Sequence, residues 1–148
     1  MIKICFICHG NICRSPMAEF ILKDKVKKLN LEKEFIIVSR ATSYEEVGND
    51  IHYGTKEILD KNNIFYDKHF AKRIEKSDYD KYDHFICMDE NNLKNTLVIF
   101  KEDPQMKVYK LNNEDIKDPW YTGNFYETYN DIDNGIDKLL ESLKNIKK

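Results

Sequence analysis

The sequence is poor in the features that mark nucleic-acid-binding and membrane proteins. Its 24 lysines and arginines are matched by 26 aspartates and glutamates, which leaves a net charge of −2. A general nucleic-acid-binding protein needs a strong basic surplus to neutralise phosphates. No stretch approaches the roughly 18 apolar residues that a membrane-spanning helix requires. We therefore expect neither a nucleic-acid partner nor a membrane partner.

The sequence is also short of cysteine and lacks a secretory signal. The apolar start of the chain is too short, and too soon interrupted, to be a signal peptide. The four cysteines among 148 residues are therefore expected to be thiols of a reducing compartment, with a cytoplasmic location as the default. Without a repeat, a linker or a low-complexity tract, residues 1–148 are expected to form a single domain.

Apolar segments alternate with helical periodicities along the chain. Residues 2–8 form a nearly continuous apolar run, which is typical of a strand buried on both faces of a parallel sheet. Shorter apolar runs predict strands at residues 35–38, 85–88 and 108–111. Apolar residues at helical spacing predict helices over residues 17–29, 51–59 and 132–146. Pro16 and Asp89 suit the starts of helices after the first and third strands. This alternation indicates an α/β fold with a parallel sheet.

The loop after the first strand carries the chemistry. Ligands in open α/β sheets bind beyond the carboxyl ends of the strands, where residues 8–15 lie. Gly10 and Asn11 are best able to take a positive φ, which turns successive N–H groups inward. Inward amides and the N-terminus of the next helix form an anion cradle and favour the thiolate form of Cys8. Arg14 adds a planar fork that matches two phosphate oxygens.

Residues 8–16, CHGNICRSP, resemble the signature of the low-molecular-weight protein tyrosine phosphatases. The resemblance continues in chain order over residues 17–19, 39–43, 46–49, 69–71, 87–93 and 118–121. It implies an α/β fold in which helices flank a four-stranded parallel sheet on both sides, with the phosphate-binding loop after the first strand. It also implies a single phosphatase domain that hydrolyses phosphotyrosine proteins or small aryl phosphates through a cysteinyl-phosphate intermediate, without a cofactor.

The resemblance also assigns the catalytic residues and the pocket. Cys8 is the nucleophile, Arg14 binds the phosphate, and Asp118 protonates the departing phenolate and later activates water. Pro119 holds Asp118 in an extended conformation that suits an aimed acid, although Asp-Pro is also a common turn. The substrate pocket is assigned to the loop and to three aromatic residues, namely His9, Gly10, Asn11, Ile12, Cys13, Arg14, Ser15, Tyr44, Trp120 and Tyr121.

Further residues are expected to support the nucleophile. Ser15 is expected to donate its hydroxyl to the Cys8 sulfur, and it also suits a helix cap. Cys13 matches a residue that forms a reversible disulfide with the nucleophile under oxidation; the alternative is a small residue facing the core. The residues that match family positions bracing the loop from behind are Asn11, Glu19, Ser39 and His69.

The cysteines do not predict a metal site or a Cys-x-x-Cys redox pair. Cys5 and Cys8 lie three positions apart in an extended strand, so they are about 10 Å apart, face opposite sides and cannot bridge. Cys87 is expected in the middle of a strand, which excludes it as a zinc ligand. We therefore expect no metal.

Three residues depart from the family pattern at the pocket. His9 replaces a usually apolar wall residue, so its ring either contacts the substrate, tunes Cys8 or simply packs in the wall. Trp120 stands where the family commonly has the first of two tyrosines. Glu45 takes the place of an aromatic residue, and Tyr44, one position earlier, is expected to cover the mouth. If Tyr44 does not cover it, the substrate preference will differ.

Two other functions fit parts of the sequence. A thiol-dependent arsenate reductase resembles this family in fold and loop, but that chemistry needs a further pair of cysteines on a mobile segment. After Cys13 only Cys87 remains. A phosphotyrosine-binding module without turnover is disfavoured by the presence of Cys8, Arg14 and Asp118 together. Nothing in the residues indicates an oligomeric state.

Overall fold

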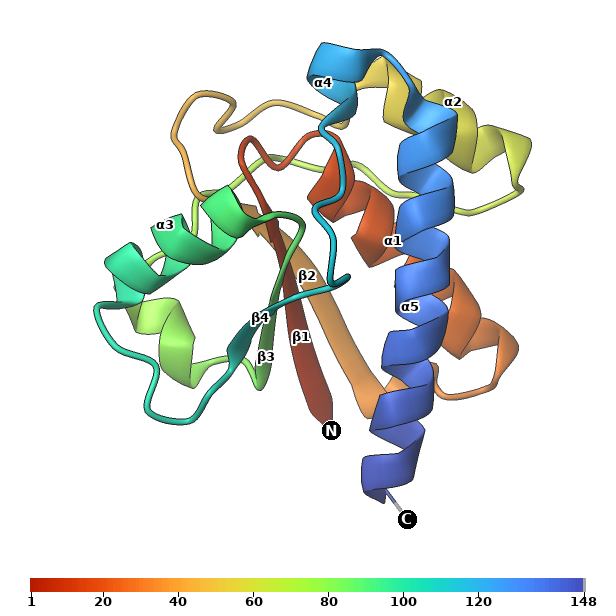
Figure 1. The fold of residues 1–148 in the computed structure, drawn as a ribbon. Helices are drawn as coiled ribbons and strands as arrows, with labels where there is room; N and C mark the ends of the chain where they lie inside the picture. Colours follow the sequence, from red (N-terminus) through yellow and green to blue (C-terminus); the bar gives the residue numbers. More distant parts are fainter. Residues whose placement is uncertain (148) are drawn as a thin grey trace.

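A four-stranded parallel sheet forms the centre of the molecule (Figure 1). The computed structural model describes the backbone of residues 1–147 and the side chains of residues 1–144. Every neighbouring pair of strands is parallel, which confirms the predicted fold class. The strands, in the spatial order β2-β1-β3-β4, are β1 (Ile2–Cys8), β2 (Phe35–Ala41), β3 (His84–Cys87) and β4 (Val108–Lys110).

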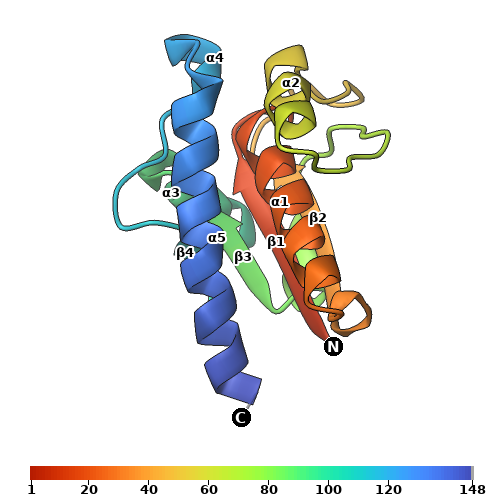
Figure 2. The same ribbon diagram turned by 90° about the vertical axis from the view of Figure 1, so that its right-hand side faces the viewer.

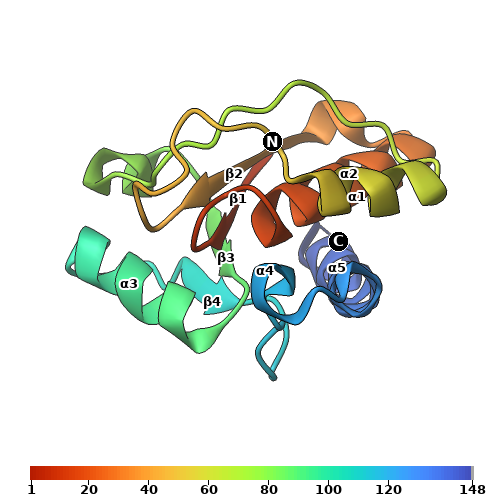
Figure 3. The same ribbon diagram turned by 90° about the horizontal axis from the view of Figure 1, so that it is seen from above.

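Helices cover both faces of the sheet. On one face lie α1 (Arg14–Lys28) and α5 (Phe125–Lys147), which run side by side, and α2 (Tyr53–Lys61) packs against both (Figure 2). On the other face lie α3 (Glu90–Phe100) and the 3₁₀-helix η2 (Lys76–Asp80) (Figure 3). Two short elements complete the fold, η1 (Glu32–Glu34) and α4 (Pro119–Thr122). Among the described residues, no helix combines the length and apolar character of a membrane span.

The central position of β1 explains its apolar sequence. Ile4 and Phe6 belong to the core beneath α1 and α5, whereas Cys5 and Ile7 belong to the core beneath α3. All four side chains are fully buried, because β1 has a strand on each side and helices above and below it.

The element boundaries differ from the prediction at a few places. β2 continues to Ala41, which pairs with the last residue of β1, and α1 begins two residues before Pro16. The last helix begins at residue 125, because Asn124 Oδ1 accepts the Glu127 N–H at 3.0 Å and caps its first turn. Helices of three to five residues, such as α4, show no periodicity in the sequence and were not predicted. The side chain of Ile146 lies outside the described residues.

The loops that follow the strands converge at the carboxyl edge of the sheet. The N–H of Thr42, after β2, donates to the Cys8 carbonyl at 3.0 Å. The N–H of Ile116, after β4, donates to the Met88 carbonyl, after β3, at 2.9 Å. The loop after β1 therefore lies at the same end of the molecule as α4 and the start of α3, where open α/β sheets bind ligands.

Candidate active site

Residues 8–15 form a tight loop between β1 and α1 that wraps around the Cys8 sulfur. Asn11 has a positive φ of 60°, as predicted, and its backbone N–H donates to Cys8 Sγ at 3.3 Å. Gly10 does not have a positive φ, so that prediction is wrong. The glycine instead allows a close approach of Glu46, because a Cβ would lie 3.2 Å from Glu46 Cγ.

A chain of hydrogen bonds behind the loop fixes the direction of the bond between Ser15 and Cys8. The N–H of Lys72 donates to Asn11 Oδ1 at 3.1 Å, so Asn11 Nδ2 points the other way. Nδ2 donates to Ser15 Oγ at 2.8 Å and to Ser39 Oγ at 2.9 Å. Because Ser15 Oγ already accepts this bond, its own hydrogen is free for Cys8 Sγ, 3.0 Å away. The geometry therefore agrees with Ser15 as the donor.

Glu19 and His69 hold this network in place. Ser39 Oγ donates to Glu19 Oε1 at 2.6 Å, and Lys23 Nζ pairs with Glu19 Oε2 at 2.6 Å. His69 Nε2 lies 2.7 Å from the Asn11 carbonyl oxygen, which only accepts, so His69 is the donor. The structure thus places all four predicted bracing residues directly behind the loop.

Arg14 is buried at the start of α1 with its guanidinium at the base of the site. Nη1 donates to Asp89 Oδ2 at 2.7 Å and to the Ile116 carbonyl at 2.8 Å. Nη2 lies 3.5 Å from Asp118 Oδ2. Burial by itself lowers the pKa of Arg14, but the charges of Cys8 and of the two carboxylates outweigh burial and raise that pKa. Arg14 is therefore a cation beside Cys8, held in orientation by Asp89.

Asp118 lies at the edge of the site as the N-cap of α4. Its backbone is extended, with φ −77° and ψ 114°, as predicted from the following Pro119. Oδ1 accepts the Trp120 N–H at 3.0 Å, while Oδ2 faces Arg14. The side chain is 23% exposed, so the carboxyl group can exchange protons with water.

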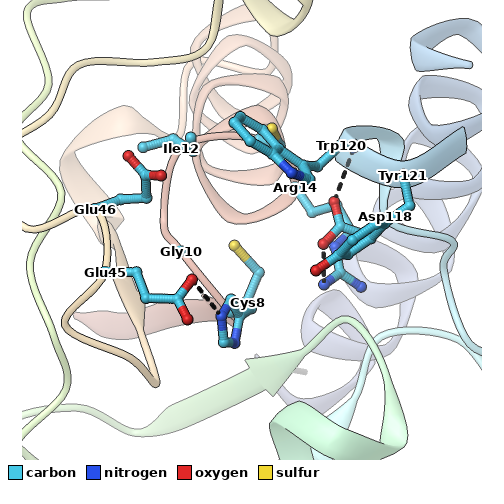
Figure 4. A pocket seen from close by; sticks show the side chains of 11 residues that line it. Cys8, Gly10, Ile12, Arg14, Glu45, Glu46, Asp118, Trp120 and Tyr121 are labelled. Carbon is cyan, nitrogen blue, oxygen red and sulfur yellow. Dashed lines mark hydrogen bonds and ion pairs between the residues drawn. The ribbon is translucent and has the colours of Figure 1, made fainter. Parts of the chain in front are cut away.

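These groups surround one cavity of about 100 Å³ (Figure 4). Asn11 and Ser15, which were predicted to bind substrate, are fully buried behind its wall, so only the Asn11 backbone and the Ser15 hydroxyl reach Cys8. The lining residues come from the loop, from the segment after β2 and from the region of α4; they are Cys8, His9, Gly10, Ile12, Cys13, Arg14, Glu45, Glu46, Asp118, Trp120 and Tyr121.

One side of the cavity mouth is acidic, where an aromatic cover was predicted. His9 Nε2 lies 3.0 Å from Glu45 Oε2, and both residues line the cavity. Tyr44 does not line it, because its ring packs against the Arg73 guanidinium, whose carbon lies 4.5 Å from the ring centroid. The prediction that Tyr44 covers the mouth is therefore wrong. The aromatic side of the mouth is formed by Trp120 and Tyr121 (Figure 4).

Comparison with known proteins decides the family. The model of the low molecular weight phosphotyrosine protein phosphatase family matches residues 3–148. The chain belongs to this family. The low molecular weight protein-tyrosine-phosphatase YfkJ of Bacillus subtilis is 37% identical over 100% of the chain and 99% of its own length. The relative PtpA of Staphylococcus aureus, with the same description, is 34% identical over 97% of the chain and 94% of its own length. The crystal structure of SP-PTP from Streptococcus pyogenes is 42% identical, has a TM-score of 0.91, and matches 97% of the chain and 93% of its own length.

Two acidic residues of this phosphatase site were not predicted, namely Glu46, which lines the cavity, and Asp89. Asp89 was predicted only as a helix cap, and Oδ1 does accept the Asn92 N–H at 2.8 Å at the start of α3. Its other oxygen, Oδ2, orients Arg14. A usable signal was its position directly after β3, because parallel strands end at one edge and Asp89 must therefore lie near Cys8.

Burial raises the pKa of the other three thiols of the phosphatase. Burial raises the pKa of Cys13 well above its ordinary value, and the neighbouring Cys8 raises it further. Cys5 and Cys87 lie within the sheet, where burial raises the pKa of both, that of Cys87 to about 12. All four cysteines are free. Among the described residues, no three His, Cys, Asp or Glu side chains are grouped to hold a metal ion.

Proposed function

We propose that Cys8, Arg14 and Asp118 carry out the phosphatase reaction of this chain, the hydrolysis of phosphotyrosine proteins and small aryl phosphates. The observation that supports this most is that the thiol and the guanidinium of one loop and a carboxyl group from a distant segment line one cavity. Arg14 interacts with both of the other groups. The charge of Cys8 raises the pKa of Arg14, and Arg14 Nη2 lies 3.5 Å from Asp118 Oδ2. Each group has the chemistry that one step of the reaction needs.

In the first step, the phosphate enters the loop and Cys8 attacks phosphorus. The loop amides, the N-terminus of α1 and the Arg14 guanidinium offset the charge of the phosphate oxygens. The bond from phosphorus to the phenolic oxygen breaks as the bond to sulfur forms, and Asp118 gives its proton to the departing phenolate. The product of this step is a cysteinyl phosphate and an ionised Asp118.

In the second step, water replaces Cys8 at phosphorus. The Asp118 carboxylate takes a proton from the attacking water, which restores the acid for the next cycle. Cys8 leaves as a thiolate, and the hydroxyl of Ser15, 3.0 Å from the sulfur, stabilises it. The network through Asn11 keeps that hydroxyl pointed at the sulfur.

The walls above the loop suit an aromatic leaving group. Ile12 of the loop and Trp120 of α4 both line the cavity, and Tyr121 lies beside Asp118 (Figure 4). Apolar and aromatic walls of this kind bind a phenyl ring through burial and ring contacts. This arrangement supports aryl phosphates as the substrate class.

The cysteine positions argue against a thiol-dependent arsenate reductase. That reaction needs two further thiols that relay a disulfide from the nucleophile. Cys5 and Cys87 are both fully buried in strands of the sheet, and burial raises the pKa of each thiol. Neither can move to Cys8 without opening the sheet, so the phosphatase reaction is the better supported of the two.

Phosphatase activity is tested with the purified protein, a phosphotyrosine peptide and phenyl phosphate. We expect release of phosphate from both substrates, with many turnovers per protein molecule, dependence on a thiol reductant and no loss in a chelator. A single stoichiometric binding event without phosphate release would instead indicate a binding module. Production of arsenite from arsenate in the same buffer would favour the reductase.

We propose that Cys13 protects Cys8 from permanent oxidation, in a protein that works in the reducing cytoplasm. Both thiols line the same cavity, and Cys8 contributes to the raised pKa of Cys13. Peroxide converts the Cys8 thiolate to a sulfenic acid; the Cys13 thiol then attacks that sulfur, which forms a disulfide and releases water. Two electrons from a thiol reductant restore both thiols.

The Cys13→Ser variant tests this protection. After brief exposure to peroxide and then to reductant, the parent should regain most of its activity. Cys13→Ser should regain clearly less, because its Cys8 sulfenic acid has no thiol beside it and oxidises further to the sulfinic acid. Equal recovery by the two proteins would show that the disulfide is not used. Mass spectrometry of Cys8 checks the oxidation state directly.

A further inference from the structure

A cluster of rings joins the helix that follows Asp118 to the start of α2. His52, just before α2, lies at the centre of this cluster. Its ring stacks on Phe125, with centroids 5.2 Å apart and planes at 16°. Trp120 meets it edge-on, at 5.5 Å and 77°. Because Trp120 belongs to α4 and Phe125 begins α5, the His52 ring contacts the chain on both sides of the turn that ends α4.

His52 is tied to the phosphate-binding loop by its backbone. Its N–H donates to the Ile12 carbonyl at 2.9 Å, and its Nδ1 accepts the Gly54 N–H at 3.0 Å and caps α2. The Phe125 ring packs directly against the backbone of Gly54 in α2. The contact is so close that a Cβ on Gly54 would lie 2.5 Å from the ring. The ring cluster is therefore fixed relative to the loop that holds Cys8.

The position of α4 depends on a few contacts, among them the burial of Pro119 and the cap that Asp118 forms with the Trp120 N–H. It contains four residues and ends at Gly123, which has a φ of 71°. A helix this short is not stable in water without contacts to the rest of the protein. Tyr121 is 82% exposed, so it anchors α4 poorly. Trp120 is 55% exposed, and its contact with the His52 ring adds a constraint on α4 from the side of α2.

We propose that His52 is a positioning residue that holds Asp118 in place through Trp120 and Phe125. This inference rests on the proposed role of Asp118 as the general acid. His52 does not line the cavity, so it acts on Asp118 through its neighbours. A displacement of about 1 Å at a catalytic group can cost about 10²-fold in rate. Phosphate binding by the loop and Arg14 does not depend on this contact.

Two substitutions separate the two roles of the His52 side chain. His52→Asn keeps an acceptor for the Gly54 N–H but removes the ring, whereas His52→Phe keeps a ring and removes the acceptor. We measure kcat/KM, which reports the steps up to release of the leaving group, for phenyl phosphate, whose leaving group needs a proton, and for p-nitrophenyl phosphate, whose leaving group does not. His52→Asn should lose about 10- to 100-fold with phenyl phosphate and little with p-nitrophenyl phosphate. His52→Phe should recover most of that loss while melting at a lower temperature than the parent.

His84→Asn is the matched control, because His84 also contacts an aromatic ring, that of Tyr109, at the start of β3 and away from the cavity. It should leave the ratio of the two rates unchanged. If His52→Asn lowers both rates equally, or neither, the inference is overturned. If His52→Asn does not fold, Trp120→Leu removes the same contact from the other side and should lower the same ratio; an unchanged ratio there also overturns the inference.

Asp118→Asn, assayed beside these variants, separates this inference from the proposed function. An unchanged ratio in Asp118→Asn would show that Asp118 is not the acid, and the proposed function would then fail. A lowered ratio in Asp118→Asn together with an unchanged ratio in His52→Asn would show that His52 does not position it.

Discussion

Replacing Cys8 with serine should lower turnover by at least about 10³-fold, because loss of the nucleophile costs more than this in other covalent enzymes. An unassisted hydroxyl is a far poorer nucleophile than a thiolate. The fold should persist, since serine is close to cysteine in size and its oxygen can keep the bonds to the Asn11 N–H and to Ser15. The measurement is kcat for p-nitrophenyl phosphate, with the melting temperature recorded for each protein.

Cys87→Ser makes the same chemical change outside the cavity. Cys87 is fully buried in β3, with Sγ 3.8 Å from Thr96 Oγ1, so this variant should keep its kcat even if it melts earlier. Cys8→Ser should still bind inorganic phosphate, because the loop amides and Arg14 remain. Residual turnover within about tenfold of the parent would contradict the role of Cys8 as nucleophile.

The strand, loop and helix at the start of the chain were predictable because their signals are local. The nearly continuous apolar run over residues 2–8 is typical of a strand with both faces covered, and β1 proves to be a strand with neighbours on both sides. The left-handed conformation of Asn11 was also predictable, because few residue types tolerate it. The sheet edge at which the loop lies then follows from the parallel topology.

Other parts of the site depend on contacts between distant segments, and these were not predictable from local patterns. The close approach of Gly10 to Glu46 involves a residue from another loop. Tyr44 is held away from the mouth by Arg73, so its place in the sequence gave a wrong expectation. Asp89 orients a guanidinium 75 positions earlier in the chain, and only its strand-end position hinted at that role.

The resemblance to a known family supplied what local patterns could not. Asp-Pro alone is more often a turn, and Asp118 does cap a short helix as a turn residue would. Its second oxygen faces Arg14, so the capping role and the catalytic role use different atoms of one side chain. From the sequence alone these two roles are alternatives, but the geometry allows both.

This division of the two Asp118 oxygens makes Asp118→Asn a clean test of the acid. Asparagine is as good an N-cap as aspartate, so its side-chain oxygen can still accept the Trp120 N–H and hold α4. What is lost is the proton of the first step and the carboxylate base of the second. With phenyl phosphate, kcat should fall by about 10²- to 10⁴-fold, the usual contribution of one general acid. With p-nitrophenyl phosphate, the first step should be nearly spared, because its leaving group departs without a proton.

The second step distinguishes the acid from the base. Without the carboxylate to activate water, hydrolysis of the cysteinyl phosphate should limit turnover of Asp118→Asn, so rapid mixing with p-nitrophenyl phosphate should give a burst of nitrophenol close to one per site. Asp115→Asn is the matched control, because Asp115 is half exposed and pairs with Lys110 at 3.0 Å outside the cavity. It should show neither the burst nor the dependence on leaving group. If Asp118→Asn loses the same factor in kcat/KM, which reports the first step, with both substrates, Asp118 only shapes the loop, and another group must supply the proton.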